Sequence, residues 1–276
     1  MLKKYLLLAA GCLLLALPAR AEVKPFAELW NNIAYYDTNT EKKGFTSVLG
    51  RLQGKLGVSP FDFPLQVYGV YYITTSPAND SWDNATYAGV GVRLHPFAGY
   101  QPSGGLDAWV PKVKLFLERL TPSYQKGSGP AETDTQYGFD LWHEWNLDKA
   151  DPNESWGELW TNLTVPTNNY AATNFNGYLF YFQPKIGRHL GRGVEPYIKA
   201  DVIMSNKTDY WLNVATYGVG IRFEPWRGIS DANELVRKFK MFAEVLSVSY
   251  LKDSPTDPNK SVGSDARLGV DFSFGR

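Results

Sequence analysis

The stretch ATYGVGIRF, residues 215–223, alternates large apolar side chains with small or charged ones. Tyr217, Val219, Ile221 and Phe223 take one face of an extended chain, and Arg222 shares the other face with a threonine and two glycines. A repeat of two residues is the period of a β-strand, whereas a helix repeats every 3.6 residues. The stretch therefore predicts a strand with one apolar and one polar face.

The same alternation recurs along the chain, for example where Leu115 and Leu117 alternate with Lys114 and Glu118. It predicts twelve antiparallel strands, at residues 23–36, 44–58, 63–75, 82–96, 109–121, 134–147, 154–165, 175–188, 193–205, 210–224, 235–251 and 264–275. Most of these segments reach the roughly 9–11 residues that a tilted strand needs to cross a bilayer, and exceed the ~5–6 typical of soluble proteins. We therefore expect an all-β fold, a transmembrane antiparallel β-barrel of about twelve strands. A soluble sandwich or lipocalin-like barrel is the alternative.

Composition agrees with a membrane barrel. Aromatic residues make up 15% of the chain, with 17 Tyr, 15 Phe and 9 Trp, and girdles of aromatic residues are typical of outer-membrane barrels. Beyond the first residues, no run of 18 apolar residues predicts a spanning helix. Any passage through a membrane must therefore be made by strands.

The chain also repeats itself at a spacing of about 130 residues. AELWNN at 27–32 returns as GELWTN at 157–162, and ATYAGVGVRLHP at 85–96 returns as ATYGVGIRFEP at 215–225. A register kept through six strands predicts an internal duplication. The two halves would span about 22–147 and 152–276 and close together into one barrel domain.

The N-terminus carries the pattern of an export signal. Lys3 and Lys4 precede an apolar run and a small-residue cleavage site that ends at residue 21, which predicts a signal peptide over residues 1–21. Cleavage before a lipidated Cys12 is the alternative. We expect the protein to be exported to the outer membrane of a Gram-negative bacterium.

Charge and cysteine content exclude several kinds of partner. Removing Lys3, Lys4 and Arg20 leaves 25 basic residues against 28 acidic ones, a net charge of −3 that argues against a nucleic-acid partner. Cys12 is the only cysteine, and the histidines at 95, 143 and 189 lack metal-ligand spacing. We expect no cofactor and no metal.

The polar face of the strands carries charges that would cost a few kcal/mol each in lipid, so we expect them to line the barrel interior. With two repeated tryptophans, these candidate lumen residues are Arg93, Arg222, Lys55, Lys112, Lys114, Lys185, Lys238, Lys240, Glu28, Glu118, Glu158, Glu244, Asp140, Asp271, Trp30 and Trp160. They could form packed ion-pair ladders or line an aqueous passage. Inward aromatic residues could stack on sugar rings as a saccharide slides past, or simply fill space.

Two connections are also repeated, at residues 96–109 and 225–235. In the second, SDANEL at 230–235 combines a serine cap with acidic residues in the first turn, which predicts a short helix.

Residues 82–97 and 211–226, followed by an aromatic-rich strand and a final Asp-x-Arg-x-Gly-Val at 265–270, resemble the C-terminal barrel of bacteriophage adsorption protein A and of related exopolysaccharide export proteins. The resemblance implies a barrel that takes part in polymer export or phage adsorption.

Two functions from different classes follow. The first is an outer-membrane channel or export component for a saccharide or other polar solute. The second is a non-conducting barrel, held in outer-membrane lipid, that serves as a phage receptor or as the anchor of envelope export partners. A third hypothesis, a lipid-modifying enzyme, has no Gly-x-Ser-x-Gly motif to support it, and we expect the protein not to be an enzyme.

Overall fold

The computed structural model describes residues 23–38, 45–60, 64–79, 83–127, 133–147, 153–166, 177–227, 229, 234–252 and 261–275. The predicted signal peptide and Cys12 lie outside these residues. The strands are β1 (Lys24–Thr38), β2 (Phe45–Ser59), β3 (Leu65–Thr75), β4 (Ala85–Leu94), β5 (Val113–Tyr124), β6 (Asp134–Trp145), β7 (Ser155–Pro166), β8 (Leu179–Arg188), β9 (Val194–Ser205), β10 (Val214–Phe223), β11 (Phe239–Tyr250) and β12 (Ser261–Phe274).

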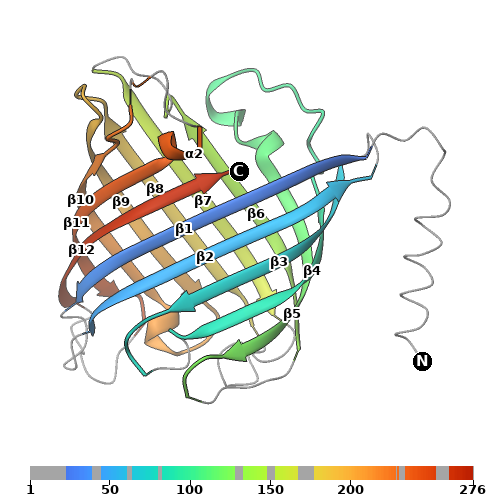
Figure 1. The fold of residues 1–276 in the computed structure, drawn as a ribbon, viewed down its shortest axis with the longest axis horizontal. Coiled ribbons are helices and arrows are strands. Elements are labelled where there is room, and N and C mark those ends of the chain that lie inside the picture. Colours follow the sequence, from blue (N-terminus) through green and yellow to red (C-terminus); the bar gives the residue numbers. More distant parts are fainter. Residues whose placement is uncertain are drawn as a thin grey trace.

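The twelve strands form a closed barrel in which each strand pairs with its neighbours in sequence and β1 pairs with β12. The seam between first and last strands is antiparallel and runs from Leu29 opposite Phe274 to Thr38 opposite Asp265. Figure 1 shows the strands steeply tilted, as closure of a sheet into a barrel requires. The predicted twelve-strand antiparallel barrel is confirmed.

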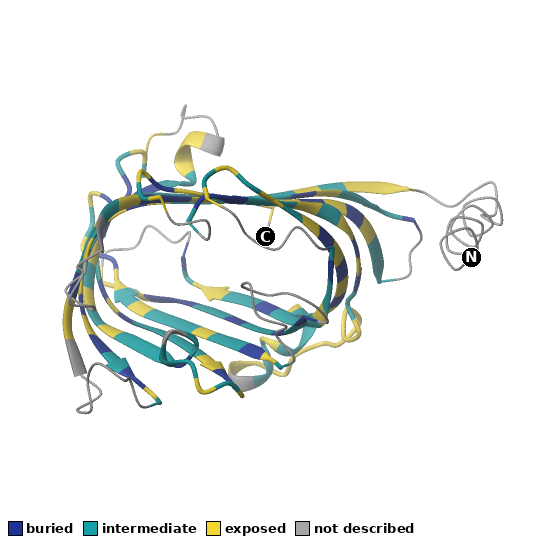
Figure 2. Cartoon of the chain, turned by 90° about the horizontal axis from the view of Figure 1, so that it is seen from below, coloured by how far each residue is buried: buried dark blue, intermediate teal, exposed yellow. Residues whose placement is uncertain are grey.

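The barrel has two distinct ends and a flattened outline. We call the end where β1 begins at Lys24 and β12 ends at Phe274 the terminal end, and the opposite one the distal end. Seen from below, the ring of strands is a flattened oval with two broad walls (Figure 2). In Figure 1, β1 and β2 cross in front of β6 and β7, so these strands belong to opposite walls.

Apolar side chains of the strands point outward. On β10, Val219 and Ile221 are 59% and 48% exposed, whereas Arg222 between Ile221 and Phe223 is 3% exposed. Leu56, Val90 and Leu268, on three other strands, are more than half exposed as well. A lipocalin-like soluble barrel would place its apolar face inward, so this orientation contradicts the soluble alternative and matches a membrane barrel.

Of the strands that begin later than predicted, β5, β10 and β11 do so because the residues before them form helical turns. Val110–Lys112 and Tyr210–Leu212 are 3₁₀ turns, and Glu234–Arg237 is the short helix α2. Pro111 has no N–H to donate to a neighbouring strand, which favours the turn before β5. A helix was predicted at residues 230–235. The observed helix, Glu234–Arg237, overlaps the last two of these residues and extends two residues further. Residues 230–233 lie outside the described part. No helix in the described residues is long and apolar enough to cross a membrane.

The distal end holds the same contact twice. The Asn84 side chain accepts a hydrogen bond from Ser76 N at 3.1 Å, and Lys126 Nζ donates to Ser76 O at 2.8 Å, so a lysine of one hairpin fastens the preceding one. The corresponding residues of the second half are Asn213, Ser205 and Lys252. The two-half duplication stays a prediction from sequence, and these matched contacts support it.

Candidate functional site: the inner wall of the barrel

The inner wall carries fourteen of the sixteen predicted lumen residues, at positions whose side chains point inward from the strands. The two exceptions are Lys112 and Lys238, which precede β5 and β11 at the terminal end. Lys112 is exposed there and Lys238 is partly buried. Because the turn at Val110–Lys112 lies before β5, strand alternation does not fix the direction of the Lys112 side chain, which lines a cavity together with Lys114.

A buried ion pair stands at mid-height in the first half. The Glu118 carboxylate is 1% exposed and accepts hydrogen bonds from Lys55 Nζ at 2.8 Å and from the hydroxyls of Tyr68 and Tyr72 at 2.9 Å each. Gln136 donates a fourth, at 2.8 Å. Every lone-pair direction of the carboxylate is therefore used, which is what makes a buried charge tolerable.

The second half has a related cluster built from a different lysine. Glu244 accepts a hydrogen bond from the hydroxyl of Tyr197 at 2.7 Å and pairs with Lys199 at 3.1 Å. Lys199 was missed by sequence reasoning because its counterpart in the first half is Val70, so the repeat does not mark it. Lys185, which the repeat does mark, pairs with Glu158 at 3.4 Å instead.

Glycines make both clusters possible. A Cβ on Gly91 would lie 2.7 Å from ring atoms of Tyr68, and one on Gly220 would lie 2.5 Å from the ring of Tyr197. Each tyrosine ring therefore lies flat over a glycine of the next strand and brings its hydroxyl to the buried glutamate.

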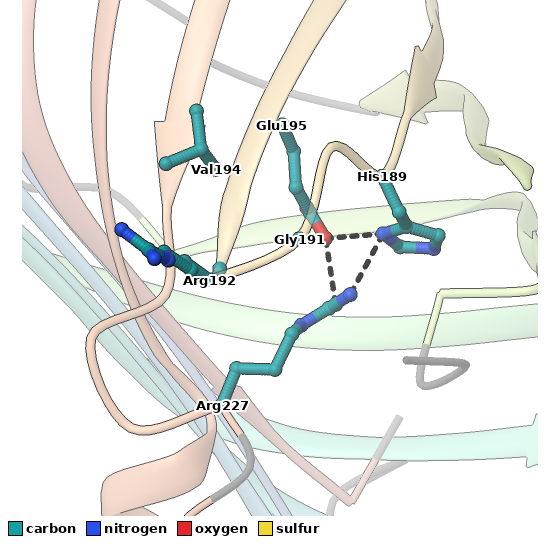
Figure 3. Close-up of a pocket in the computed structure, with 7 residues that line it drawn as sticks. His189, Gly191, Arg192, Val194, Glu195 and Arg227 are labelled. Atoms are coloured by element: carbon teal, nitrogen blue, oxygen red, sulfur yellow. Dashed lines mark hydrogen bonds and ion pairs between the residues drawn. The ribbon is translucent and has the colours of Figure 1, made fainter. Parts of the chain in front are cut away.

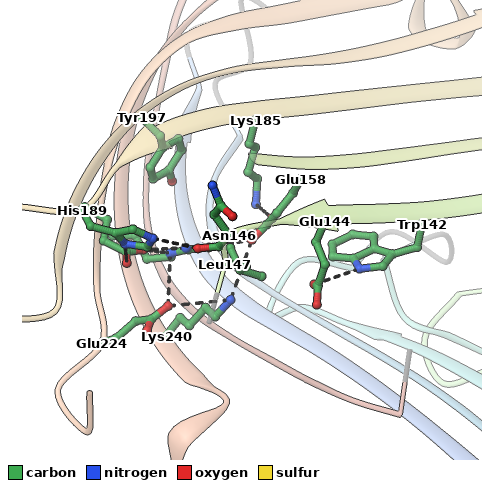
Figure 4. A network of polar contacts seen from close by, with 12 residues as sticks. Trp142, Glu144, Asn146, Leu147, Glu158, Lys185, His189, Tyr197, Glu224 and Lys240 are labelled. Carbon is green, nitrogen blue, oxygen red and sulfur yellow. Dashed lines mark hydrogen bonds and ion pairs between the residues drawn. The ribbon is translucent and has the colours of Figure 1, made fainter. Parts of the chain in front are cut away.

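At the terminal end of the second half, charges form a closed network. Arg222 donates to Glu195 at 2.7 Å and to Glu158 at 2.6 Å, and its guanidinium lies 3.9 Å from the ring centroid of Trp156. Figure 4 shows how Glu158 and Lys240 continue this network. Three carboxylates, those of Glu158, Glu195 and Glu224, hold the surrounding cations.

The loop Arg227 completes this network. It pairs with Glu195 at 2.7 Å (Figure 3) and donates a hydrogen bond to Glu224 at 2.8 Å. The fully buried His189 lies beside it, with Nδ1 2.5 Å from Glu195 Oε1 and Nε2 2.9 Å from the Asn146 carbonyl. A cavity of about 160 Å³ remains next to these residues. Neither Glu195 nor Arg227 was predicted, because neither has a charged counterpart in the first half.

The equivalent place in the first half is more open. Arg93 holds Glu28 through two hydrogen bonds, at 2.9 and 2.6 Å, and donates to Gln66 at 2.8 Å. Lys114 approaches Glu28 at 3.5 Å. A cavity of about 350 Å³ lies here, lined among others by Trp142, and is larger than the one in the second half.

These ion pairs bridge strands that are not neighbours. Glu28 on β1 reaches Arg93 on β4, and Glu158 on β7 reaches Arg222 on β10, three strands away in each case. Three strand spacings along a flat sheet are about 14 Å. Contact at 2.6 Å therefore requires a curved wall, and the pairs brace the two narrow sides of the flattened ring.

The broad walls carry two facing patches of part-exposed aromatic and amide side chains, on β1–β2 and β7–β8, where the two braces begin. On one wall Trp30 of β1 stands beside Gln53 of β2, and on the other Trp160 of β7 stands beside Gln183 of β8. Strands β1 and β7 are six positions apart in a ring of twelve, hence on opposite sides. Water reaches these four side chains.

Charged groups adjoin both patches. The inward Arg51 on β2 is exposed, and Asp140 accepts the indole N–H of Trp160 at 2.9 Å. Asp271 on β12 stands opposite Asn32 of β1. Water therefore reaches the polar side chains of the broad walls, whereas the buried ion pairs are closely packed and exclude it.

A metal centre is not among the arrangements found. Within the described residues, no three His, Cys, Asp or Glu side chains gather in a way that could hold a metal ion.

No protein-family model matches the chain, and no curated protein matches it. Solved structures similar to it include a KdgM porin in complex with disordered oligogalacturonate, at 10% identity, covering 90% of this chain and 99% of that one with a TM-score of 0.38. A NanC porin covers 89% of this chain and 100% of its own at 10% identity, with a TM-score of 0.42. A bacterial polysaccharide outer membrane secretin covers 92% and 98% at 9% identity, with a TM-score of 0.40.

Proposed function

We propose that this protein is an outer-membrane channel for saccharides or other polar solutes of similar size. The observation that carries the proposal is the pair of facing patches on the broad walls, where Trp30 with Gln53 and Trp160 with Gln183 are reached by water. Indole rings offer apolar faces that pack on sugar rings, and amides offer both donors and acceptors to hydroxyl groups. The outward apolar side chains of the strands support insertion in a bilayer.

The division of the inner wall into two kinds of surface supports passage. Charges that would trap a solute, such as Glu118 and Arg222, are packed into the narrow sides and are 1% and 3% exposed. The water-accessible patches on the broad walls present neutral indole and amide groups, with Arg51, Asp140 and Asp271 beside them. A channel must bind its solute weakly enough to release it, and neutral contacts meet that need.

Ion conductance of the refolded protein in a planar bilayer tests the proposal. We expect a steady conductance that neutral oligosaccharides reduce in a concentration-dependent way. Replacing Trp30 and Trp160 with Ala should weaken the sugar effect roughly tenfold, since each stacking contact contributes about 0.5–1.5 kcal/mol, while conductance persists. The matched control is Trp226→Ala, an exposed tryptophan beyond the end of β10.

The second candidate is a non-conducting receptor or anchor for a phage or for envelope export partners. Exposed apolar side chains at the terminal end favour the anchor for envelope partners, among them Phe97, Leu190 and Trp226 at 47%, 56% and 39% exposure. A correctly folded barrel that stays silent in the bilayer would support this candidate and contradict the channel.

A further inference from the structure

The two terminal-end charge clusters occupy equivalent places but differ in their number of carboxylates. Five positions correspond: Glu28, Gln66, Arg93, His95 and Lys114 in the first half, and Glu158, Glu195, Arg222, Glu224 and Lys240 in the second. The second set has three carboxylates against two cations, and Arg227 of the following loop supplies a third cation to them. In the first set two of those carboxylates are replaced by an amide and an imidazole, which leaves one carboxylate against two cations.

The surplus cation of the first half is Lys114. Glu28 is already held by two hydrogen bonds from Arg93, and Lys114 approaches it only at 3.5 Å. Lys114 also stands opposite Asp140 on β6, but Lys240 stands opposite Asp271 in the same way. The aspartates are therefore common to both halves, and the difference in charge comes from Gln66 and His95.

His95, just beyond the end of β4, reflects this local potential. Burial of its ring, together with the positive charges of Arg93 and Lys114, lowers the pKa of His95 to about 4. Its Nε2 lies 3.0 Å from Gln66 Oε1. The imidazole is therefore neutral at pH 7 and contributes no charge to the cluster.

The cavity at this place has the size and lining of a ligand site. It measures about 350 Å³, within the range of roughly 300–1,000 Å³ typical of small-molecule sites, whereas the second-half cavity of about 160 Å³ falls below it. Lys112 and Lys114 line it together with the indole of Trp142. Glu144 also lines it and accepts the Trp142 N–H at 3.2 Å.

We propose that the terminal-end cavity of the first half binds a carboxylated sugar or a similar carboxylate-bearing ring. The carboxylate would be held by Lys114 and Lys112, and the ring would pack on Trp142. The inference deepens the proposed channel function by naming a ligand class, and so rests on it for its biological meaning. Binding itself does not require that the barrel conduct.

The test is binding of D-glucuronate, D-glucose and acetate to the full barrel in detergent micelles, measured by calorimetry. Glucuronate and glucose differ only in a carboxylate against a hydroxymethyl group, and acetate supplies the carboxylate without a ring. We expect glucuronate to bind at least tenfold more tightly than either, because hydrogen bonds to a charged group exceed those between neutral groups. Equal affinity for glucuronate and glucose overturns the proposal, and acetate binding as tightly as glucuronate overturns the ring part of it.

Variants locate the site. Lys114→Gln should weaken glucuronate binding about tenfold, and its fold should survive because Arg93 still neutralises Glu28. Lys112→Gln, on an exposed side chain outside the strands, should weaken it less and serves if Lys114→Gln does not fold. The matched control is Lys240→Gln, which changes the equivalent lysine of the closed network and should leave the affinity unchanged.

Equal loss in Lys114→Gln and Lys240→Gln would overturn the assignment to this cavity. The result is also separable from the channel proposal. If a barrel binds glucuronate but shows no ion conductance in a bilayer, only the channel proposal is contradicted. If it conducts ions but has no preference for glucuronate, only this inference is contradicted.

Discussion

Replacing Glu118 with glutamine should remove a large part of the stability of the first half. The carboxylate is 1% exposed and accepts four hydrogen bonds of 2.8–2.9 Å, from Lys55, Tyr68, Tyr72 and Gln136. Glutamine has the same shape, so no cavity forms, but Lys55 loses its counter-ion and one accepting oxygen becomes a donor. Breaking a buried ion pair in this way costs about 3–5 kcal/mol of unfolding free energy.

The measurement is denaturant unfolding of the barrel in lipid vesicles, followed by tryptophan fluorescence. The matched control is Glu144→Gln, on an exposed glutamate of β6 that accepts a hydrogen bond from Trp142 at 3.2 Å, which should change the unfolding free energy by less than about 0.5 kcal/mol. Adding Lys55→Met to Glu118→Gln should recover part of the loss, because the unpaired charge is removed. A Glu118→Gln barrel within about 1 kcal/mol of the wild type would refute the reasoning.

Three other outcomes follow from the geometry. Gly91→Ala places a methyl group 2.7 Å from the ring of Tyr68 and should cost about 1–3 kcal/mol of unfolding free energy, whereas Gly99→Ala, with open space around it, should cost almost nothing. Val219→Arg on the outer wall should destabilise the barrel by about 2–4 kcal/mol in vesicles if this strand faces lipid, and Val219→Leu should be neutral. The imidazole resonance of His95, identified by its loss in His95→Gln, should titrate near pH 4. Because the folded state favours the neutral ring, His95 should leave stability unchanged above pH 6.5 and lower it as pH falls from 6.5 towards 4.

Much of the fold was predictable because alternation is a local property. The order of residues in each strand shows which side chains face inward and which face outward. For example, the buried Arg222 lies between the exposed Ile221 and Phe223. The strand starts near residues 113, 214 and 239 were missed because the turns before them carry apolar residues that continue the pattern. These residues fit the alternating pattern, and only the backbone geometry shows that they are not part of the sheet.

The pairing of the inner charges was not predictable in the same way. Lys55 and Glu118 lie three strands apart, and whether such side chains meet depends on strand tilt and wall curvature. Those quantities belong to the whole ring and leave no local trace. The internal repeat marked shared residues such as Glu158, but it passed over Glu195 and Lys199, where the halves differ. At the terminal end, Glu195 lies beside the smaller cavity, and its counterpart Gln66 lines the larger one.

The seam between β1 and β12 has a consequence for how the protein is made. It joins Leu29 to Phe274 and so pairs the first and the last strands of the barrel, which are far apart in the sequence. Loop-closure entropy makes such remote pairings late events, because nearly every other strand must be in place before the last can dock. Until then two long edges with unpaired backbone groups stand open, and open edges recruit other chains. The final strand therefore acts as the completion step of assembly, and a chain shortened before residue 261 would leave both edges without a partner.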